Sequence, residues 1–226
     1  MNLPVTLLVI AKAPIAGFAK TRLTPPFTPG DAARLAAAAL LDTLDAMRDA
    51  GAQRCAVAWV GDLDRAENSS EIDSALQHFD VFPQRGDDFA HRLANAHADA
   101  ARFGLPVLQI GMDTPQAGPA LLAASAAQLL DTGDAVLGPA ADGGWWALGL
   151  PGPEPARVLR GVPMSTPDTG RLTRKALRST GLRVHTLPTL TDVDTYADVL
   201  TVAAQSDGRF TAAARPHLYT PAEVSL

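Results

Sequence analysis

Asp113 stands where a buried strand is expected to end. It follows the apolar run at 107–112 and precedes Thr114 and Pro115. In open α/β sheets, ligands bind just outside the carboxyl ends of the strands, where loops and helix N-termini meet. Asp113 is therefore predicted to meet a divalent cation and the phosphates of a nucleotide. An Asp here can also cap the following helix, and the sequence alone leaves that alternative open.

Two more carboxylates, Asp192 and Asp194, immediately precede the last helical pattern. A hard cation such as Mg²⁺ or Mn²⁺ is often held by one or two carboxylates together with substrate phosphates. Asp194 paired with Asp113 would be enough, so these two residues are the predicted metal ligands. A helix cap is again the alternative interpretation.

A basic loop follows the first expected strand. It carries Lys12, Gly17, Lys20 and Arg22, all predicted to bind nucleotide. Gly17 permits a positive φ and a close backbone approach, while the cations can neutralise a di- or triphosphate. Two glycine positions of a P-loop hold proline and alanine, which excludes that motif. A solvated basic loop is the simpler alternative.

A third unusual segment runs from Asp142 through Gly143 and Gly144 to two adjacent tryptophans. Glycines beside an acid and large apolar indoles let a ligand approach the backbone, so these three residues are predicted to bind substrate. Adjacent strand residues face opposite sides, and one indole is therefore expected to fill the core. Asp142 and Asp192 are candidate general bases, although either can instead bond backbone amides in its own turn.

Composition narrows the class of protein. The chain has 226 residues, 47% hydrophobic residues and a net charge of −5, which is typical of one domain with a sizeable core. Its single cysteine, Cys55, lies in an apolar stretch and is expected in a buried strand. The negative net charge and the 5% aromatic content disfavour nucleic-acid binding. No secretory or membrane-spanning pattern is expected, so the predicted compartment is the cytoplasm. The oligomeric state is left open.

Apolar runs alternate with longer helical patterns, which is typical of a parallel sheet covered by helices. The predicted fold is α/β, with one mostly parallel sheet in a single domain over residues 1–206. A C-terminal tail over 207–226 shows no clear period and is expected to pack loosely. Strands are expected at 5–10, 56–60, 79–82, 107–112, 135–138, 144–150 and 183–187, and helices at 28–50, 87–103, 117–130, 167–180 and 195–205.

Four motifs occur in order: Ala-Lys-x-Pro-x-x-Gly-x-x-Lys-Thr-Arg-Leu, Gly-x-Asp-x-Pro, Gly-Pro-x-x-Asp-Gly-Gly and Asp-Val-Asp-Thr. Together they resemble the glycosyltransferase-A-like nucleotide-diphospho-sugar transferase superfamily, over about residues 5–202. More narrowly, the chain resembles radical-SAM-associated transferases and arsenosugar-biosynthesis glycosyltransferases. It is similar, more distantly, to 2-phospholactate guanylyltransferase and molybdenum-cofactor nucleotidyltransferases.

The resemblance implies a Rossmann-like fold and a magnesium-dependent, nucleotide-using transferase with a small-molecule acceptor. It places Lys20 and Asp113 in the catalytic machinery and Asp113 and Asp194 on the metal. Gln84, Gly86 and Arg92 lie where many relatives have Gln-Gly-x-Leu-Gly-x-Arg-Leu, but this chain interrupts that pattern at 88–90.

Two reactions remain open. In the first, an acceptor hydroxyl attacks the anomeric carbon of a nucleotide sugar. In the second, nucleotidylyl transfer, a phosphorylated acceptor attacks a nucleoside triphosphate and pyrophosphate leaves. A catalytically silent nucleotide-binding partner protein is the alternative of another class. A serine hydrolase is disfavoured because Gly-x-Ser-x-Gly is absent.

Overall fold

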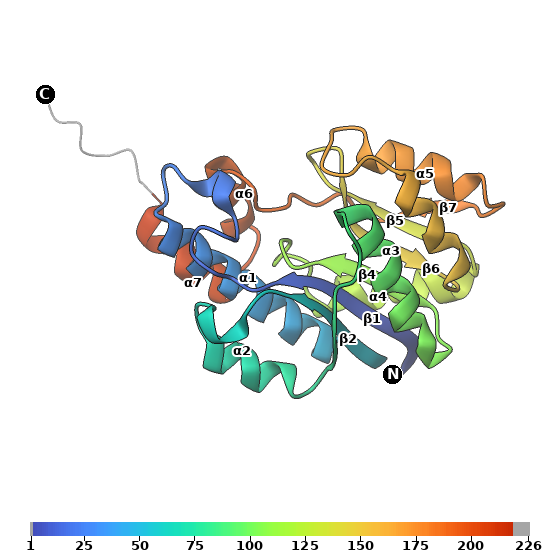
Figure 1. The fold of residues 1–226 in the computed structure, drawn as a ribbon, viewed down its shortest axis with the longest axis horizontal. Helices are drawn as coiled ribbons and strands as arrows, with labels where there is room; N and C mark the ends of the chain where they lie inside the picture. The colour runs from blue at the N-terminus through green and yellow to red at the C-terminus, as the bar shows by residue number, and fades with distance from the viewer. Residues whose placement is uncertain (1, 219–226) are drawn as a thin grey trace, which may run out of the picture.

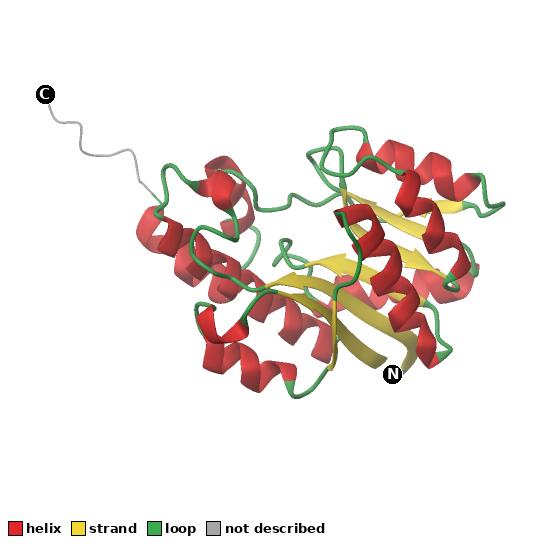
Figure 2. Cartoon of the chain, viewed as in Figure 1, coloured by secondary structure: helices red, strands yellow, loops and turns green. Residues whose placement is uncertain are grey.

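A single seven-stranded sheet forms the centre of the computed structural model, which describes residues 2–218 (Figures 1 and 2). The strand order is β3-β2-β1-β4-β6-β5-β7. All neighbouring pairs are parallel except those of β6, which is antiparallel to β4 and β5. This confirms the predicted α/β fold. The strands are β1 Leu3–Lys12, β2 Ala52–Val60, β3 Asp80–Pro83, β4 Val107–Gly111, β5 Ala135–Pro139, β6 Trp145–Leu150 and β7 Val184–Thr186.

Helices cover both faces of the sheet (Figure 2). One face packs mainly on α1 and α4, through a core that includes Leu7, Leu40 and Leu108. The other face packs on α3, on α5 and on a 3-10 segment, Glu154–Gly161. The α-helices are α1 Pro29–Asp49, α2 Ser69–Leu76, α3 Phe89–Ala100, α4 Pro119–Thr132, α5 Thr169–Arg178, α6 Tyr196–Ala203 and α7 Arg209–Ala214.

The start of α1 follows directly from local sequence. The Thr28 side chain accepts a hydrogen bond from the Asp31 amide at 3.1 Å, and the Asp31 carboxylate accepts from the Thr28 amide at 3.3 Å. Pro29 occupies the first turn, where its missing N–H costs nothing. This capping box ends the loop that carries the basic residues, so both ends of that loop are anchored in regular structure.

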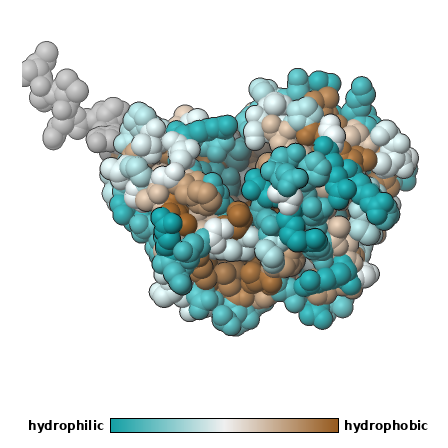
Figure 3. Space-filling view, viewed as in Figure 1, coloured by the Kyte–Doolittle hydropathy of each residue, from teal (hydrophilic) through white to brown (hydrophobic). Residues whose placement is uncertain are grey.

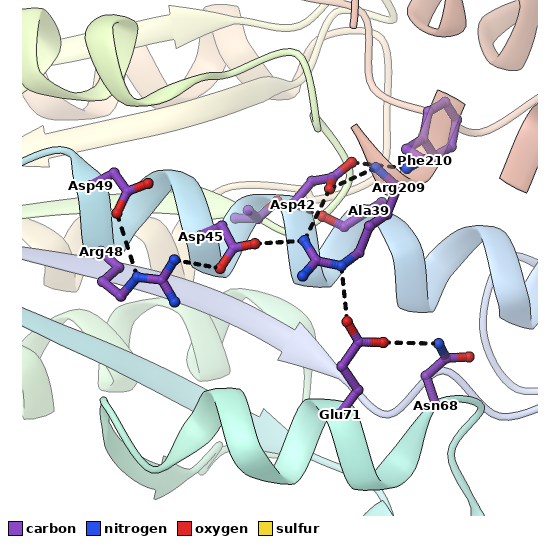
Figure 4. A network of polar contacts seen from close by, with 10 residues as sticks. Ala39, Asp42, Asp45, Arg48, Asp49, Asn68, Glu71, Arg209 and Phe210 are labelled. Atoms are coloured by element: carbon purple, nitrogen blue, oxygen red, sulfur yellow. Dashed lines mark hydrogen bonds and ion pairs between the residues drawn. The ribbon is translucent and has the colours of Figure 1, made fainter. Parts of the chain in front are cut away.

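A polar network anchors α7 to α1 (Figure 4). Asp42 accepts hydrogen bonds from the backbone amides of Arg209 and Phe210, both at 2.9 Å. The Arg209 guanidinium bonds Asp45 at 2.5 Å and Glu71 on α2 at 2.9 Å. Phe210 is fully buried. The loose packing expected after Asp207 is therefore wrong for α7, because an apolar anchor and an ion network fix it; residues 219–226 of the expected tail lie outside the described residues.

The parallel arrangement decides where the site can be. Strands β1, β2, β3, β4, β5 and β7 all end at one edge of the sheet, so the loops after them meet there. The antiparallel β6 instead begins at that edge and carries the glycine-rich turn into it. Among residues 2–218, no helix is both long and apolar enough to cross a membrane.

Candidate active site

Asp113 and Asp194 converge on one ammonium group, although 80 residues separate them in the sequence. The Lys20 Nζ lies 2.6 Å from Asp113 Oδ2 and 3.0 Å from Asp194 Oδ1. Arg22 Nη1 bonds the other oxygen of Asp194 at 3.1 Å. The structure thus brings together the two predicted metal ligands and two cations of the basic loop.

Backbone contacts fix this convergence. The amide of Val193 donates to the carbonyl of Asp113 at 3.0 Å, which joins the loop after β7 to the end of β4. Gln116 Nε2 donates to the Thr191 carbonyl at 2.5 Å and reinforces the same join. Asp194 is then held by its own amide, which donates to the Asp198 carboxylate at 3.2 Å. Asp194 consequently faces Asp113 because the two loops are hydrogen-bonded to each other.

Neither acid is a helix cap. Gly118 is the N-cap residue of α4, and the side chain of Thr195 caps α6. The capping alternative for Asp113 and Asp194 is therefore wrong. Their carboxylates are free to take part in chemistry, apart from their bonds to Lys20 and Arg22.

Lys20 is buried rather than solvated, with 10% of its side chain exposed. Burial opposes its charge, but Asp113 and then Asp194 more than offset this and raise the pKa of Lys20. The same pairing lowers the pKa of Asp194 despite the opposing effect of burial. Lys20 also has a left-handed backbone, with φ of 52°, which is uncommon outside glycine. A solvated loop is thus the wrong interpretation for Lys20, although Arg22 is 66% exposed.

A cavity of about 660 Å³ opens beside this cluster and spans the whole carboxyl edge of the sheet. Lys12, Arg22, Asp113, Asp142 and Asp194 all line it, together with Gly144 and Asp192. Figure 3 shows the surface hollowed between the part that carries α6 and the part that carries α3 and α5. Gly17, Lys20 and Gly143 do not line the cavity; Lys20 lies behind Asp113 and Asp194, which do, and Gly17 has a φ of 75° and shapes the turn before Phe18, another lining residue.

Charge in the cavity is divided between its two sides. Asp142, Asp192 and Asp194 each place an oxygen within 4.8 Å of the others, on the side of β5 and β7. Burial, followed by the charges of Asp142 and Asp194, raises the pKa of Asp192 to about 6. The Asp142 carboxylate accepts from the Gly144 amide at 2.7 Å, so this acid also bonds a backbone amide in its own turn. This side of the cavity is acidic.

As predicted, one of the two adjacent tryptophans lies in the core and the other faces the cavity. Trp146 is 2% exposed, lies in the core and donates from Nε1 to the Pro188 carbonyl at 2.9 Å. Trp145 is half-buried and lines the cavity with its Nε1 buried and without a partner among the described residues. Trp145 is thus the indole available to a ligand on the acidic side.

The segment at 163–169, which closes this side of the cavity, carries no signal in the sequence that marks it as part of a site. Met164, Ser165 and Thr166 line it, and Ser165 has a positive φ of 57°. Gly143 packs so closely on this segment that an added Cβ would lie 2.0 Å from the Pro167 carbonyl oxygen. No sequence motif signals this contact, because it depends on two loops that meet only in three dimensions.

Replacing Gly143 with alanine should therefore separate the two loops. Its φ of 92° and the backbone clash with Pro167 lead us to expect a loss of roughly 2–4 kcal/mol in the free energy of unfolding. Urea unfolding of Gly143→Ala against Gly161→Ala measures this, since a Cβ at Gly161 meets nothing within 4 Å. Equal stability of the two variants would contradict the close packing.

A pair of aromatic side chains at the cavity was not among the site residues predicted from the sequence. Phe18 and Phe89 are 43% and 41% exposed, respectively, and both line it. Gln84 fixes the same region, because its Nε2 donates to the carbonyls of Ala11 at 2.8 Å and Ala58 at 3.0 Å. This side of the cavity, next to β1, β2 and β3, is aromatic and carries Lys12 and Arg92.

A mostly parallel sheet with acids and a basic loop at its carboxyl edge fits the class of nucleotide-diphospho-sugar transferase folds, which the structural comparison shows. A candidate nucleotide-diphospho-sugar transferase from Desulfovibrio desulfuricans G20 superposes with a TM-score of 0.82 and 26% identity, over 96% of each chain. The chain belongs to the family described as "Uncharacterized protein conserved in bacteria (DUF2064)", whose model matches residues 43–166. That range contains Asp113, Asp142 and Arg92. No protein of curated function matches the chain.

More distant structures share the fold. Rv0371c from Mycobacterium tuberculosis H37Rv, in a complex with manganese, has a TM-score of 0.54 and 22% identity, over 88% of this chain and 97% of that one. A nucleotidyl transferase from Methanothermobacter thermautotrophicus has a TM-score of 0.51 and 17% identity, over 88% and 95%. The structure from Desulfovibrio desulfuricans G20, at 26% identity, confirms the superfamily resemblance, and both that protein and the Methanothermobacter protein are named as transferases. The narrower resemblance to arsenosugar-biosynthesis enzymes stays a prediction.

Proposed function

We propose that the chain is a divalent-cation-dependent glycosyltransferase that moves a sugar from a nucleotide-sugar donor to a small acceptor. The observation that carries the proposal is the convergence of Asp113 and Asp194 on Lys20 Nζ, at 2.6 and 3.0 Å, beside a cavity of about 660 Å³. Paired carboxylates can hold a divalent cation, and that cation together with a buried lysine can neutralise a phosphorylated leaving group.

The residues present fit a divalent cation. Asp113 and Asp194 already share one positive charge, that of Lys20, and both present carboxylate oxygens, the ligands that Mg²⁺ and Mn²⁺ prefer. Asp142 and Asp192 lie close to Asp194 and add negative charge. Asp113 and Asp194 would hold the ion. A bound Mg²⁺ or Mn²⁺ supplies Lewis-acid neutralisation of the charge on the leaving diphosphate.

The side chains have separate parts in the transfer. An acceptor oxygen bonds to the anomeric carbon, the bond from that carbon to the diphosphate oxygen breaks, and the nucleoside diphosphate leaves with the electron pair. Lys20 stabilises the departing charge. Asp192 is the better candidate for the acceptor's proton, because its pKa of about 6 suits a base near neutral pH. Asp142 is held in its turn by the Gly144 amide.

The charge on the acceptor side supports glycosyl transfer. Asp142 and Asp192 line the cavity there with Trp145, and the nearby Arg22 is already bound to Asp194. A phosphorylated acceptor would face these acids without an unpaired cation among the described residues on that side. A hydroxyl-bearing acceptor without negative charge fits better, since its hydroxyl can donate to a carboxylate.

Nucleotidylyl transfer is the second candidate, and the positions of the acids favour it. Asp113 and Asp194 follow two different strands, β4 and β7, rather than standing together after one strand. A 4-diphosphocytidyl-2C-methyl-D-erythritol synthase shares the fold with a TM-score of 0.58 at 13% identity, over 92% of this chain and all of that one. The same cluster would then stabilise a leaving pyrophosphate.

A nucleotide screen and a product assay test both candidates. Nucleoside di- and triphosphates and nucleotide sugars are added with and without Mg²⁺ or Mn²⁺, and unfolding is followed thermally. A ligand at about 100 times its Kd stabilises by roughly 2.7 kcal/mol, which is about 5 °C or more for a chain of this size. Release of a nucleoside diphosphate from a nucleotide sugar supports glycosyl transfer, and pyrophosphate from a triphosphate supports the alternative. No metal-dependent shift with any nucleotide would refute the proposal.

A further inference from the structure

Two cations in the cavity have no acidic partner. Lys20 and Arg22 are paired with Asp113 and Asp194, so their charge is already balanced. Lys12 and Arg92 also belong to the cavity lining, but among residues 2–218 neither forms an ion pair. The unbalanced positive charge in the cavity therefore lies at these two residues, away from the acids Asp142 and Asp192.

Lys12 is the last residue of β1 and its ammonium is held in place. It donates to the Phe18 carbonyl and lies 3.6 Å from the centre of the Phe18 ring. Both contacts leave hydrogens of the ammonium free, since a lysine has three donors. Burial, and then the positive charge of Arg92, lower the pKa of Lys12, as expected for two cations that face one cavity.

Arg92 approaches from the first turns of α3. Asp88 caps this helix by accepting from the His91 amide at 2.8 Å. Gly86, with φ of 139°, packs against the same turn so tightly that an added Cβ would lie 2.9 Å from the Arg92 amide nitrogen. The guanidinium carbon lies 5.8 Å from the centre of the Phe89 ring, and the buried Nε has no hydrogen-bond partner within the described part of the chain. The helix thus presents a guanidinium whose Nε no acceptor in residues 2–218 satisfies.

We infer that Lys12 and Arg92 together clamp the diphosphate of the nucleotide, and that Arg92 is a substrate-binding residue. The inference rests on the proposed function and extends it to a residue on α3. Two like charges facing one cavity repel each other until an anion lies between them. A guanidinium and an ammonium are the side chains that best bind phosphate oxygens.

The clamp explains how one cavity can use both its unpaired cations and its carboxylates. Lys12 and Arg92 hold phosphate at the end of β1 and on α3, whereas Asp113 follows the neighbouring strand β4 and Asp194 follows β7. The phosphate chain then bridges the two sides, which places the sugar of the donor next to the acidic side. A nucleoside diphosphate is expected to bind more tightly than the monophosphate, because the second phosphate reaches both the clamp and the paired acids with their cation.

Titration calorimetry with pyrophosphate, in the presence of Mn²⁺, tests the clamp on the full chain. We expect Lys12→Met and Arg92→Met each to weaken pyrophosphate binding by about tenfold or more, as the loss of a charge-assisted contact predicts. Arg92→Lys should recover part of the loss because it keeps the charge. Arg102→Met is the matched control, because Arg102 stacks on Phe82 and Phe103 and does not line the cavity.

The outcomes separate the clamp from the proposed function. Wild-type affinity for pyrophosphate in Arg92→Met, with Arg102→Met also unchanged, would overturn the clamp while leaving the transferase proposal standing. A wild-type protein that binds neither pyrophosphate nor any nucleotide would overturn both. Thermal unfolding of each variant without ligand shows whether it is folded, and an Arg92→Met that unfolds is replaced by Arg92→Gln for the same titration.

Discussion

Asp113→Asn and Asp194→Asn are each expected to lower kcat/KM of the metal-dependent transfer by about 100-fold or more. An amide keeps the shape of the carboxylate but carries no charge, so the cation loses one of its two strong protein ligands. The reaction is followed by release of nucleoside diphosphate or pyrophosphate, whichever the donor screen identifies. Lys20 keeps one acidic partner in each variant, so the fold should persist.

Asp134→Asn is the matched control for these two variants. Asp134 is also a paired carboxylate, bound to Arg183 at 2.8 Å, but it does not line the cavity. Its loss should leave kcat/KM within a factor of about two, because nothing links that ion pair to the transfer. Wild-type activity in both Asp113→Asn and Asp194→Asn would remove the metal hypothesis.

Lys20→Met is expected to have two separable effects. Transfer should fall by about 100-fold or more, since Lys20 neutralises the leaving group. Without metal, the free energy of unfolding should drop by roughly 2–4 kcal/mol, because the half-buried Asp113 then has no counter-charge and Asp194 keeps only the exposed Arg22. Methionine keeps most of the side-chain volume, so packing should change little.

A divalent cation should reverse the loss of stability in Lys20→Met but not the loss of transfer activity. Mn²⁺ bound between Asp113 and Asp194 restores the missing positive charge, so it should stabilise Lys20→Met more than it stabilises the wild type. Thermal unfolding with and without Mn²⁺ measures this difference. Lys175→Met is the control, because Lys175 is exposed on α5 and removed from the site. A Lys20→Met protein that gains no more from Mn²⁺ than the wild type does would contradict the pairing.

Much of this arrangement could be predicted because it follows from local rules. Periodic apolar runs separated by helices specify a parallel sheet, and a parallel sheet gathers the residues after its strands at one edge. Asp113 and Asp194 were therefore predictable as neighbours without any knowledge of their contacts. The capping box at Thr28 and the half-hairpin at β6 were similarly visible in sequence.

Other parts depend on contacts between distant segments. The lone charges of Lys12 and Arg92 can be recognised only once it is known that Lys20 and Arg22 are paired with acids. The sequence of the basic loop alone does not distinguish the cations that are paired with acids from the one that is not. The same limit applies to α7, where the anchor is a network from α1 and α2 rather than any periodicity of its own. The segment around Ser165 is positioned by the Gly143 turn, which no local motif predicts.

Anomalous diffraction from crystals grown with Mn²⁺ and a nucleoside diphosphate tests the central claim most directly. The account predicts one manganese peak bonded to carboxylate oxygens of both Asp113 and Asp194, with the nucleotide's phosphates beside it. Manganese bound elsewhere, or nucleotide in the cavity with no metal at these two acids, would contradict it.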